Sequence, residues 1–128
     1  MAGNLAGVRT YDVRAVSSGT FGRVLLSARD QHLVVDGPAQ NGCPGEAVTP
    51  AELFLGGVVT CAVELVEVIA RERGVALEGA RAVIHGEMDP STRVREDVNL
   101  FSSVTLDFEL AGVGDEDAAA LVEAFKSR

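Results

Sequence analysis

The sequence has little basic charge, few aromatic or sulfur side chains and no long hydrophobic run. Its 128 residues include no tryptophan, one tyrosine and two cysteines, and 19 acidic side chains outnumber 11 basic ones. Nucleic-acid binding begins with Lys and Arg side chains that neutralise phosphates, so the net charge of −8 argues against nucleic acid and anionic membranes as partners. The longest uncharged apolar run, from Leu53 to Val63, is about half of the ~20 residues that cross a bilayer, so we expect a buried segment and no membrane span.

The composition is typical of a folded globular protein. Hydrophobic residues make up 47% of the chain and charged residues 23%, which excludes disordered and fibrous classes. A chain of this length fits one compact domain, so we expect a single domain over residues 1–128. Residues 1–7 have neither the basic start nor the long apolar stretch of a secretory signal, so we expect a cytoplasmic protein with two free thiols.

Hydrophobic periodicity predicts an α+β fold with mostly antiparallel strands. Three short runs near the N-terminus, separated by turn residues, favour an antiparallel meander. A loop rich in glycine and proline follows over residues 36–48, and then come a long helix, two further strands and a second helix. The expected strands are residues 11–17, 23–28, 31–35, 77–88 and 102–110, and the expected helices are residues 50–73 and 115–126.

The long helix has clear start and stop signals. Thr49 is a good N-cap, Glu52 completes a capping-box pattern, and Gly74 is a typical residue just past a helix end. The first half is apolar all round and predicts burial on every side, whereas charges in the second half predict that the helix emerges toward solvent. Gly56 and Gly57 inside the helix predict the close approach of another backbone, for which we expect a second helix.

Cys61 is the first candidate for chemistry. A cysteine in so apolar a stretch is either a small hydrophobic core residue or a reactive thiol, and a reactive thiol here needs a donor such as an arginine from elsewhere in the fold. Glu52 lies about 14 Å below it along the helix axis, so it contributes to a thiol site only indirectly or from another subunit. Cys43, in the loop, is either an incidental surface thiol or a partner that reaches toward Cys61.

Metal and nucleotide sites are not indicated by the sequence. His32 and His85 lie on different expected strands, and no ligand spacing gathers them into a metal site. No glycine loop leads from a strand into a helix with phosphate-binding spacing, and no nucleophile elbow is present. We therefore expect no metal and no cofactor.

The run from Gly45 to Cys61, GEAVTPAELFLGGVVTC, gives a more specific indication. It resembles the signature of the OsmC family, which includes osmotically inducible protein C and the organic hydroperoxide resistance proteins. In that signature a glycine-rich loop leads into Thr/Ser-Pro-x-Glu-Leu, a helix rich in small residues and then a cysteine. The order of elements and the Leu-Glu-Gly-Ala sequence at residues 77–80 fit as well, so the resemblance covers nearly the whole chain.

The resemblance implies an intertwined homodimer, with two active sites at its interface and the central helices buried between sheets. It implies that Cys61 is the peroxidatic thiolate, which attacks an organic hydroperoxide and becomes a sulfenic acid. Glu52 matches an acidic position of the family and is the second candidate catalytic residue. A thiol reductant supplies the electrons, and neither a metal nor a flavin takes part.

Three departures from the family pattern bear on activity. The best-known peroxidase members have a glutamate where this chain has Ala51. They also carry an arginine near the first hairpin that activates the thiol, and none of Arg14, Arg23 and Arg29 is assigned to that position. Their resolving cysteine belongs to a segment after the second helix, where this sequence ends, so we expect Cys43 or an external thiol to resolve the sulfenic acid.

Two hypotheses follow. The first is an OsmC-like redox protein that reduces organic hydroperoxides with thiols through Cys61. The alternative is a non-catalytic dimeric protein of the same fold that binds a small hydrophobic ligand at the dimer interface. The cysteine in its expected place favours the first hypothesis, whereas Ala51 and the missing resolving cysteine favour the second.

Overall fold

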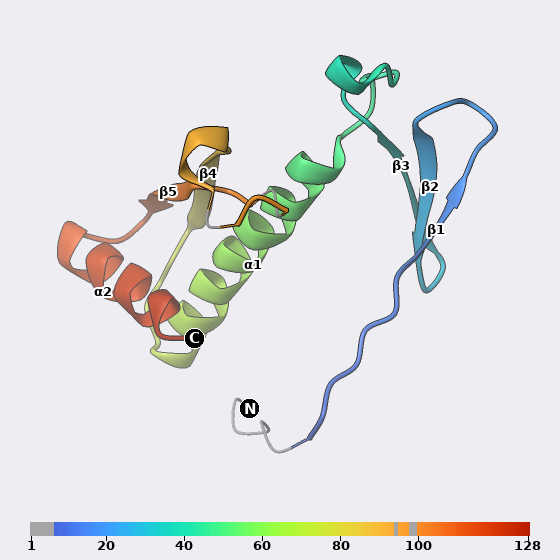
Figure 1. Cartoon of the computed structure of the whole chain (residues 1–128). Coiled ribbons are helices and arrows are strands. Elements are labelled where there is room, and N and C mark those ends of the chain that lie inside the picture. The colour runs from blue at the N-terminus through green and yellow to red at the C-terminus, as the bar shows by residue number, and fades with distance from the viewer. Residues whose placement is uncertain (1–6, 94, 98–99) are drawn as a thin grey trace. The chain divides into compact units, whose positions relative to one another are not determined.

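The computed structural model describes residues 7–93, 95–97 and 100–128. The chain divides into two compact units, Met1–Glu52 and Leu53–Arg128. Helix α1 (Pro50–Glu72) begins in the first unit and continues into the second (Figure 1). That residues 1–128 act as a single domain stays a prediction.

The first unit is an antiparallel meander in the strand order β1-β2-β3, as predicted (Figure 1). Its strands are β1 (Arg14–Ser17), β2 (Arg23–Ala28) and β3 (Gln31–Asp36). β1 begins later than residue 11 because Arg14 already pairs with Ser27, next to the last residue of β2. The loop after β3 contains one short 3-10 helix, η1 (Ala39–Asn41).

The second unit contains a long antiparallel strand pair and two helices. β4 (Gly79–Glu87) pairs with β5 (Ser103–Ala111) along its whole length. A 3-10 helix, η2 (Pro90–Thr92), follows β4, and α2 (Asp115–Lys126) follows β5. The helix η2 is capped by Asp89, whose carboxylate accepts a hydrogen bond from the Ser91 amide at 2.9 Å.

The core of the second unit lies between α2 and the C-terminal half of α1. Four residues of the two helices are fully buried and form one cluster. Phe108 of β5 and Phe125 of α2 meet edge to face beside it, with ring centroids 5.8 Å apart. The buried residues are Val66, Ile69 and Ala70 of α1 and Leu121 of α2.

Within the single chain, the distribution of burial along α1 is the reverse of the prediction. The buried side chains lie between Ala62 and Ala70, in the half expected to emerge toward solvent. The first half, expected to be buried all round, leaves Phe54 63% exposed and Val58 38% exposed. Hydrophobic periodicity identifies side chains that favour burial, but it does not identify the polypeptide that covers them.

The predicted helix across the glycine pair is also absent from the described residues. Apart from the backbone of α1 itself, no described atom lies within 4 Å of the position that a Cβ would take at Gly56 or Gly57. For the single chain this prediction is wrong, and the glycines face open space.

α1 meets the requirements for a membrane-crossing helix by length and composition alone. An 18-residue window of Pro50–Glu72 has a mean hydropathy of 2.1. One such helix is weak evidence, because core helices of soluble proteins meet the same criteria, and this helix carries three of the four buried core residues. The absence of a membrane span stays a prediction.

Candidate thiol site and the loop that precedes it

α1 begins with the reciprocal capping box that the sequence predicted. The Thr49 amide donates to Glu52 Oε1 at 2.9 Å, and the Glu52 amide donates to Thr49 Oγ1 at 3.3 Å. These bonds satisfy backbone donors of the first turn that have no partner within the helix. The carboxylate of Glu52 is therefore oriented by the backbone at the start of α1.

A buried carboxylate that sequence reasoning missed organises the loop before α1. Asp36, at the end of β3, is fully buried. Its Oδ1 accepts from Arg23 Nε at 2.8 Å, and its Oδ2 accepts from Arg23 Nη2 at 2.9 Å. Oδ2 also accepts from the amides of Glu46 at 3.0 Å and Ala47 at 2.9 Å. We call these four residues, Arg23, Asp36, Glu46 and Ala47, the Asp36 cluster.

Charge and hydrogen bonds keep the Asp36 carboxyl ionised. The Arg23 guanidinium, with help from the Ala47 amide, holds the pKa of the Asp36 carboxyl well below its usual range, although burial acts in the opposite direction. Arg23 Nη2 also donates to Glu46 Oε1 at 2.8 Å, and the two carboxylates raise the pKa of the guanidinium. Arg23, one of three candidates for the thiol-activating arginine, is therefore bound by carboxylates of its own unit.

The second cysteine packs inside the same loop. Cys43 is free and half-buried. A Cβ built at either Gly22 or Gly37 would lie 2.5 Å from its Sγ, so both positions require glycine for this packing. The Gly37 amide donates to the Gly22 carbonyl at 2.8 Å, which brings the two glycines together beneath the sulfur. Cys43 thus has a packing role in the first unit.

Cys61 lies in the second unit, on the exposed part of α1, and is a free thiol. Phe54 and Val58 precede it by seven and three residues, which places them within roughly 20° and 60° of the same helix face. The residue before it, Thr60, turns its hydroxyl back to the Gly56 carbonyl at 2.7 Å. The thiol is therefore accessible and borders an apolar stripe.

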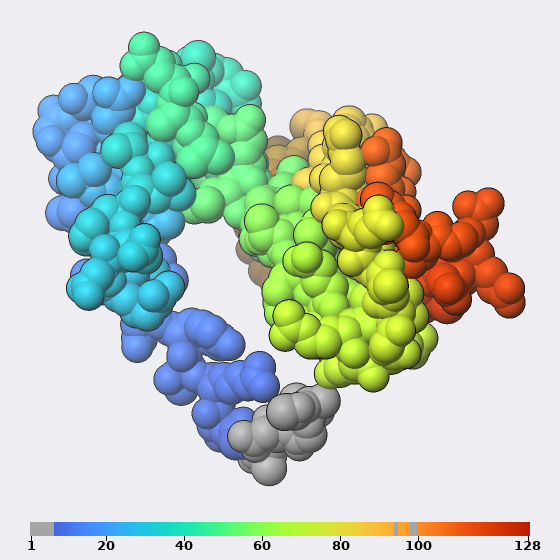
Figure 2. Space-filling view, turned by 180° about the vertical axis from the view of Figure 1, so that it is seen from behind, coloured from blue at the N-terminus to red at the C-terminus, as the bar shows by residue number. Residues whose placement is uncertain are grey.

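On another side of the same helix segment, α1 lies beside β4. Both views show this arrangement, with α1 in green and β4 in yellow in Figure 2. A shallow hollow of about 350 Å³ between them is lined by Val59, Val63 and Ala82 together with Thr60, Glu64 and Glu67. A lining that contains carboxylates and no basic side chain does not suit an anion.

An aromatic pair adjoins the first turns of α1. The rings of Phe54 and Phe101 stack with centroids 5.8 Å apart and an interplanar angle of 19°. Phe101 lies directly over Gly86 of β4, where a Cβ would come within 2.8 Å of the ring. Glycine at this position therefore makes room for the ring that supports Phe54.

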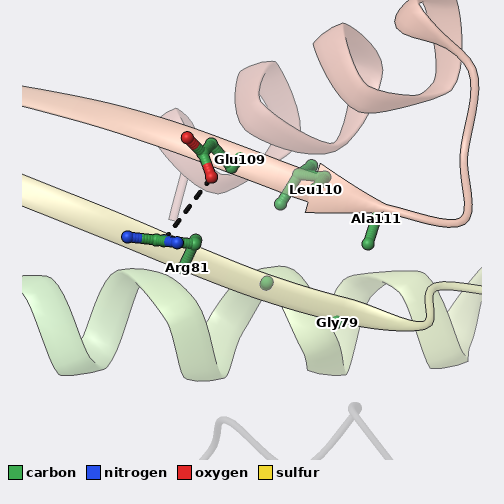
Figure 3. Close-up of a pocket in the computed structure, with 6 residues that line it drawn as sticks. Gly79, Arg81, Glu109, Leu110 and Ala111 are labelled. Atoms are coloured by element: carbon green, nitrogen blue, oxygen red, sulfur yellow. Dashed lines mark ion pairs between the residues drawn. The ribbon is translucent and has the colours of Figure 1, made fainter.

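The other polar groups outside the thiol site form ordinary surface pairs. Figure 3 shows Arg81 and Glu109 facing one another across β4 and β5. The distance from Arg81 Nε to Glu109 Oε2 is 3.5 Å, and both residues line an open pocket of about 430 Å³. His32 pairs with Ser27 at 2.8 Å and His85 with Glu87 at 2.9 Å. Within the described residues, no group of three or more His, Cys, Asp or Glu side chains is arranged to hold a metal ion.

Comparison with known proteins decides the family. The chain matches the family model described as OsmC-like protein over residues 43–128, which include the capping box and both cysteines. The chain belongs to the OsmC-like family. No curated protein matches this OsmC-like chain.

Solved structures agree with the family fold. An OsmC-like protein from Mycoplasma pneumoniae superposes with a TM-score of 0.78 at 13% identity, over 94% of this chain and 82% of that one. An organic hydroperoxide resistance protein OsmC from Legionella pneumophila has a TM-score of 0.74 at 21% identity, over 94% and 85% of the two chains. One from Elizabethkingia anophelis has a TM-score of 0.76 at 14% identity, over 96% and 85%. At these identities the likeness establishes the α+β, OsmC-like fold.

Proposed function

We propose that this OsmC-like protein reduces organic hydroperoxides with electrons from a thiol reductant, and that Cys61 is its nucleophile. The observation that carries the proposal is a free, exposed thiol on the helix that follows the family's loop. Two proteins of similar fold, from Legionella pneumophila and Elizabethkingia anophelis, are described as organic hydroperoxide resistance proteins. Membership of the OsmC-like family supports a redox role in the response to oxidative stress.

The proposed reaction has two stages, the oxidation of Cys61 by the peroxide and its reduction by thiols. The Cys61 thiolate attacks the terminal peroxide oxygen, an S–O bond forms, the O–O bond breaks, and the alcohol leaves after it takes up a proton. A thiol then attacks the sulfur of the sulfenic acid, which releases water and leaves a mixed disulfide. If the first thiol is external, a second external thiol displaces Cys61 as a thiol, and the two external thiols leave as a disulfide. If the first thiol is Cys43, two external thiols reduce the Cys61–Cys43 disulfide to two free thiols and leave as their own disulfide.

Glu52 and an arginine complete the proposed site. The carboxylate of Glu52 is fixed at the start of α1 and remains exposed, so it can act on a thiol or on an arginine of another subunit. Arg23 already binds two carboxylates, whereas Arg14 donates to the Arg29 carbonyl at 3.2 Å and to no carboxylate among the described residues. Arg14 and Arg29 therefore remain the candidates for the thiolate.

We further propose a cytoplasmic homodimer. Val16, Leu25 and Val34 are cross-strand partners on one face of the meander and are all exposed. Leu33 is exposed on the opposite face, and the first half of α1 is exposed as well. Exposed apolar surface on several elements marks an association site, and a second copy of the chain would cover it.

Peroxide consumption tests the catalytic proposal. Purified protein is mixed with cumene hydroperoxide and a dithiol, and the loss of peroxide is followed beside the Cys61→Ser and Cys43→Ser variants. Turnover that disappears only in Cys61→Ser is the expected result if an external thiol resolves the sulfenic acid, and loss in both variants assigns resolution to Cys43. Equal rates for the wild type and Cys61→Ser would eliminate Cys61 as the nucleophile.

A second candidate function is the binding of a small hydrophobic ligand without catalysis. The apolar stripe of Phe54 and Val58 and the stacked Phe101 favour it, as does Ala51 in place of a glutamate. Titration with a fluorescent fatty acid separates the two functions. Binding that persists in Cys61→Ser, in a protein that consumes no peroxide, supports this second function.

A further inference from the structure

The Asp36 cluster ties the end of β3 to the start of α1. The Asp36 carboxylate binds the amides of Glu46 and Ala47, and the Asp36 amide donates to the Val48 carbonyl at 3.0 Å. Three consecutive residues are thereby held against one side chain and its backbone. The next residue along the chain, Thr49, is the N-cap of α1.

The group at the centre of this arrangement is the carboxylate of Asp36, which is fully buried. A carboxylate excluded from water is unfavourable unless charged and polar partners surround it. Asp36 has such partners on both oxygens, because Arg23 presents two donors in a rigid fork and the loop presents two amides. If any donor moves, a buried charge loses its partner, so the geometry of residues 46–48 is strongly defined.

The fixed segment leads directly to the candidate catalytic carboxylate. Val48 precedes the capping box, and within that box the Thr49 amide orients Glu52 Oε1 at 2.9 Å. The orientation of the Glu52 carboxylate thus depends on where the backbone of Thr49 lies. The Asp36 cluster determines that position from within the first unit.

We propose that Asp36, together with Arg23, is a positioning residue for the thiol reaction, because it fixes the loop that presents the Glu52 carboxylate. This inference rests on the proposed peroxidase function. Asp36 itself is buried and touches no substrate. Its effect on turnover passes through Glu52, which distinguishes it from a residue that only stabilises the fold.

A double-mutant cycle tests this dependence. Asp36→Asn keeps the size of the side chain but replaces one acceptor oxygen with a donor that faces amides or the guanidinium. Glu52→Gln removes the carboxylate charge while glutamine still serves the capping box. We expect Asp36→Asn to lower kcat/KM for cumene hydroperoxide at least 10-fold when Glu52 is present, and less than 2-fold in the Glu52→Gln background.

Matched variants keep the test independent of misfolding. Asp30→Asn makes the same change at an exposed aspartate of the turn between β2 and β3, and it should leave kcat/KM unchanged. Glu46→Gln weakens only the exposed bond to Arg23 and should lower kcat/KM 2- to 3-fold if Asp36→Asn does not fold. Amide hydrogen exchange at Glu46 and Ala47 should accelerate at least 10-fold in Asp36→Asn.

The outcomes separate this inference from the proposed function. An active wild type whose kcat/KM is unchanged by Asp36→Asn overturns the positioning role alone. An equal loss with and without the Glu52 carboxylate also overturns it, because the effect would then not pass through Glu52. A wild type that consumes no peroxide overturns the proposed function together with the positioning role, even if exchange at Ala47 responds as expected.

Discussion

The loop before α1 and the first half of α1 follow one another in sequence but are stabilised in opposite ways. In the loop, a buried carboxylate has four hydrogen-bond donors, and Cys43 packs onto two glycines. In the helix, Phe54, Val58 and Cys61 are exposed, and the glycine pair faces open space. The polar segment has its hydrogen-bond partners within one chain, whereas the apolar segment leaves large side chains exposed.

This difference separates the residues that are positioned within the single chain from those that we propose a second subunit covers. The loop and the capping box position Glu52 without help from another molecule. A reactive thiol needs charged or polar groups near its sulfur, and we expect such groups around Cys61 from a second subunit. Variants of the helix should therefore change activity and association, and variants of the loop should change stability, local geometry and, through Glu52, activity.

The largest expected effect is at the thiol itself. Cys61→Ser should lower peroxide turnover at least ~100-fold, because a serine hydroxyl is not ionised near neutral pH and is not oxidised to a sulfenic acid. Dimedone labelling of peroxide-treated protein, followed by mass spectrometry, should modify Cys61 in the wild type. Labelling confined to Cys43 would move the redox chemistry from the helix to the loop.

The next effect concerns association through the exposed helix stripe. Val58→Asp should weaken the dimer at least ~10-fold, because it would bury an unpaired charge in an apolar interface. Sedimentation velocity over a range of concentrations measures this change. Ser127→Asp, at the exposed end of α2, is the matched control. A wild type that stays monomeric at millimolar concentration would contradict the predicted homodimer.

Two glycine substitutions should act with opposite sign. Gly37→Ala should lower the free energy of unfolding by about 1–3 kcal/mol, because the new Cβ would lie 2.5 Å from Cys43 Sγ. Gly57→Ala should raise it by about 1 kcal/mol, because alanine favours a helix over glycine and no described atom outside the helix backbone opposes it. Urea unfolding in the Val58→Asp background excludes dimer effects.

The double variant Gly37→Ala/Cys43→Ala tests the cause of this loss of stability. Cys43→Ala removes the sulfur that the new Cβ at position 37 would meet, so it should restore part of the stability lost in Gly37→Ala. If the double variant is no more stable than the sum of the single changes predicts, the packing of Cys43 on Gly37 is not the cause.

The smallest expected effect is the pH dependence of the loop. The pKa of Asp36 is lowered in the folded protein, chiefly by Arg23, so its stabilisation is fully present above the unfolded pKa of about 4 and is lost as the pH falls below it. The stability difference between the wild type and Asp36→Asn should therefore be constant from pH 5 to 7 and shrink at pH 3. Urea midpoints that differ equally at pH 7 and pH 3 would contradict this.

Much of the fold was predictable because its determinants are local. The capping box needs only Thr49 and Glu52 at their spacing, and both bonds formed. The helix end at Gly74 needs a left-handed residue, and its φ is 68°. The meander and the strand pair likewise follow from alternation and turn residues.

Two features were missed for different physical reasons. The prediction ended the third strand at residue 35 and placed Asp36 in the loop, whereas β3 continues by one residue and places Asp36 opposite Arg23. The burial of this pair depends on a loop whose path the sequence does not reveal. The exposure of Phe54 and Val58 was missed because burial depends on what lies across from a side chain. No pattern within one chain supplies that information.

The ties around Asp36 also bear on how the chain can vary in length. Asp36 binds residues 46–48 directly. Residues 37–45, which include η1 and Cys43, therefore form a loop whose two ends are fixed. Residues inserted or deleted in this loop change the loop itself and leave the start of α1 where it is. The segment is thus a place where related chains can acquire new surface without displacing Glu52.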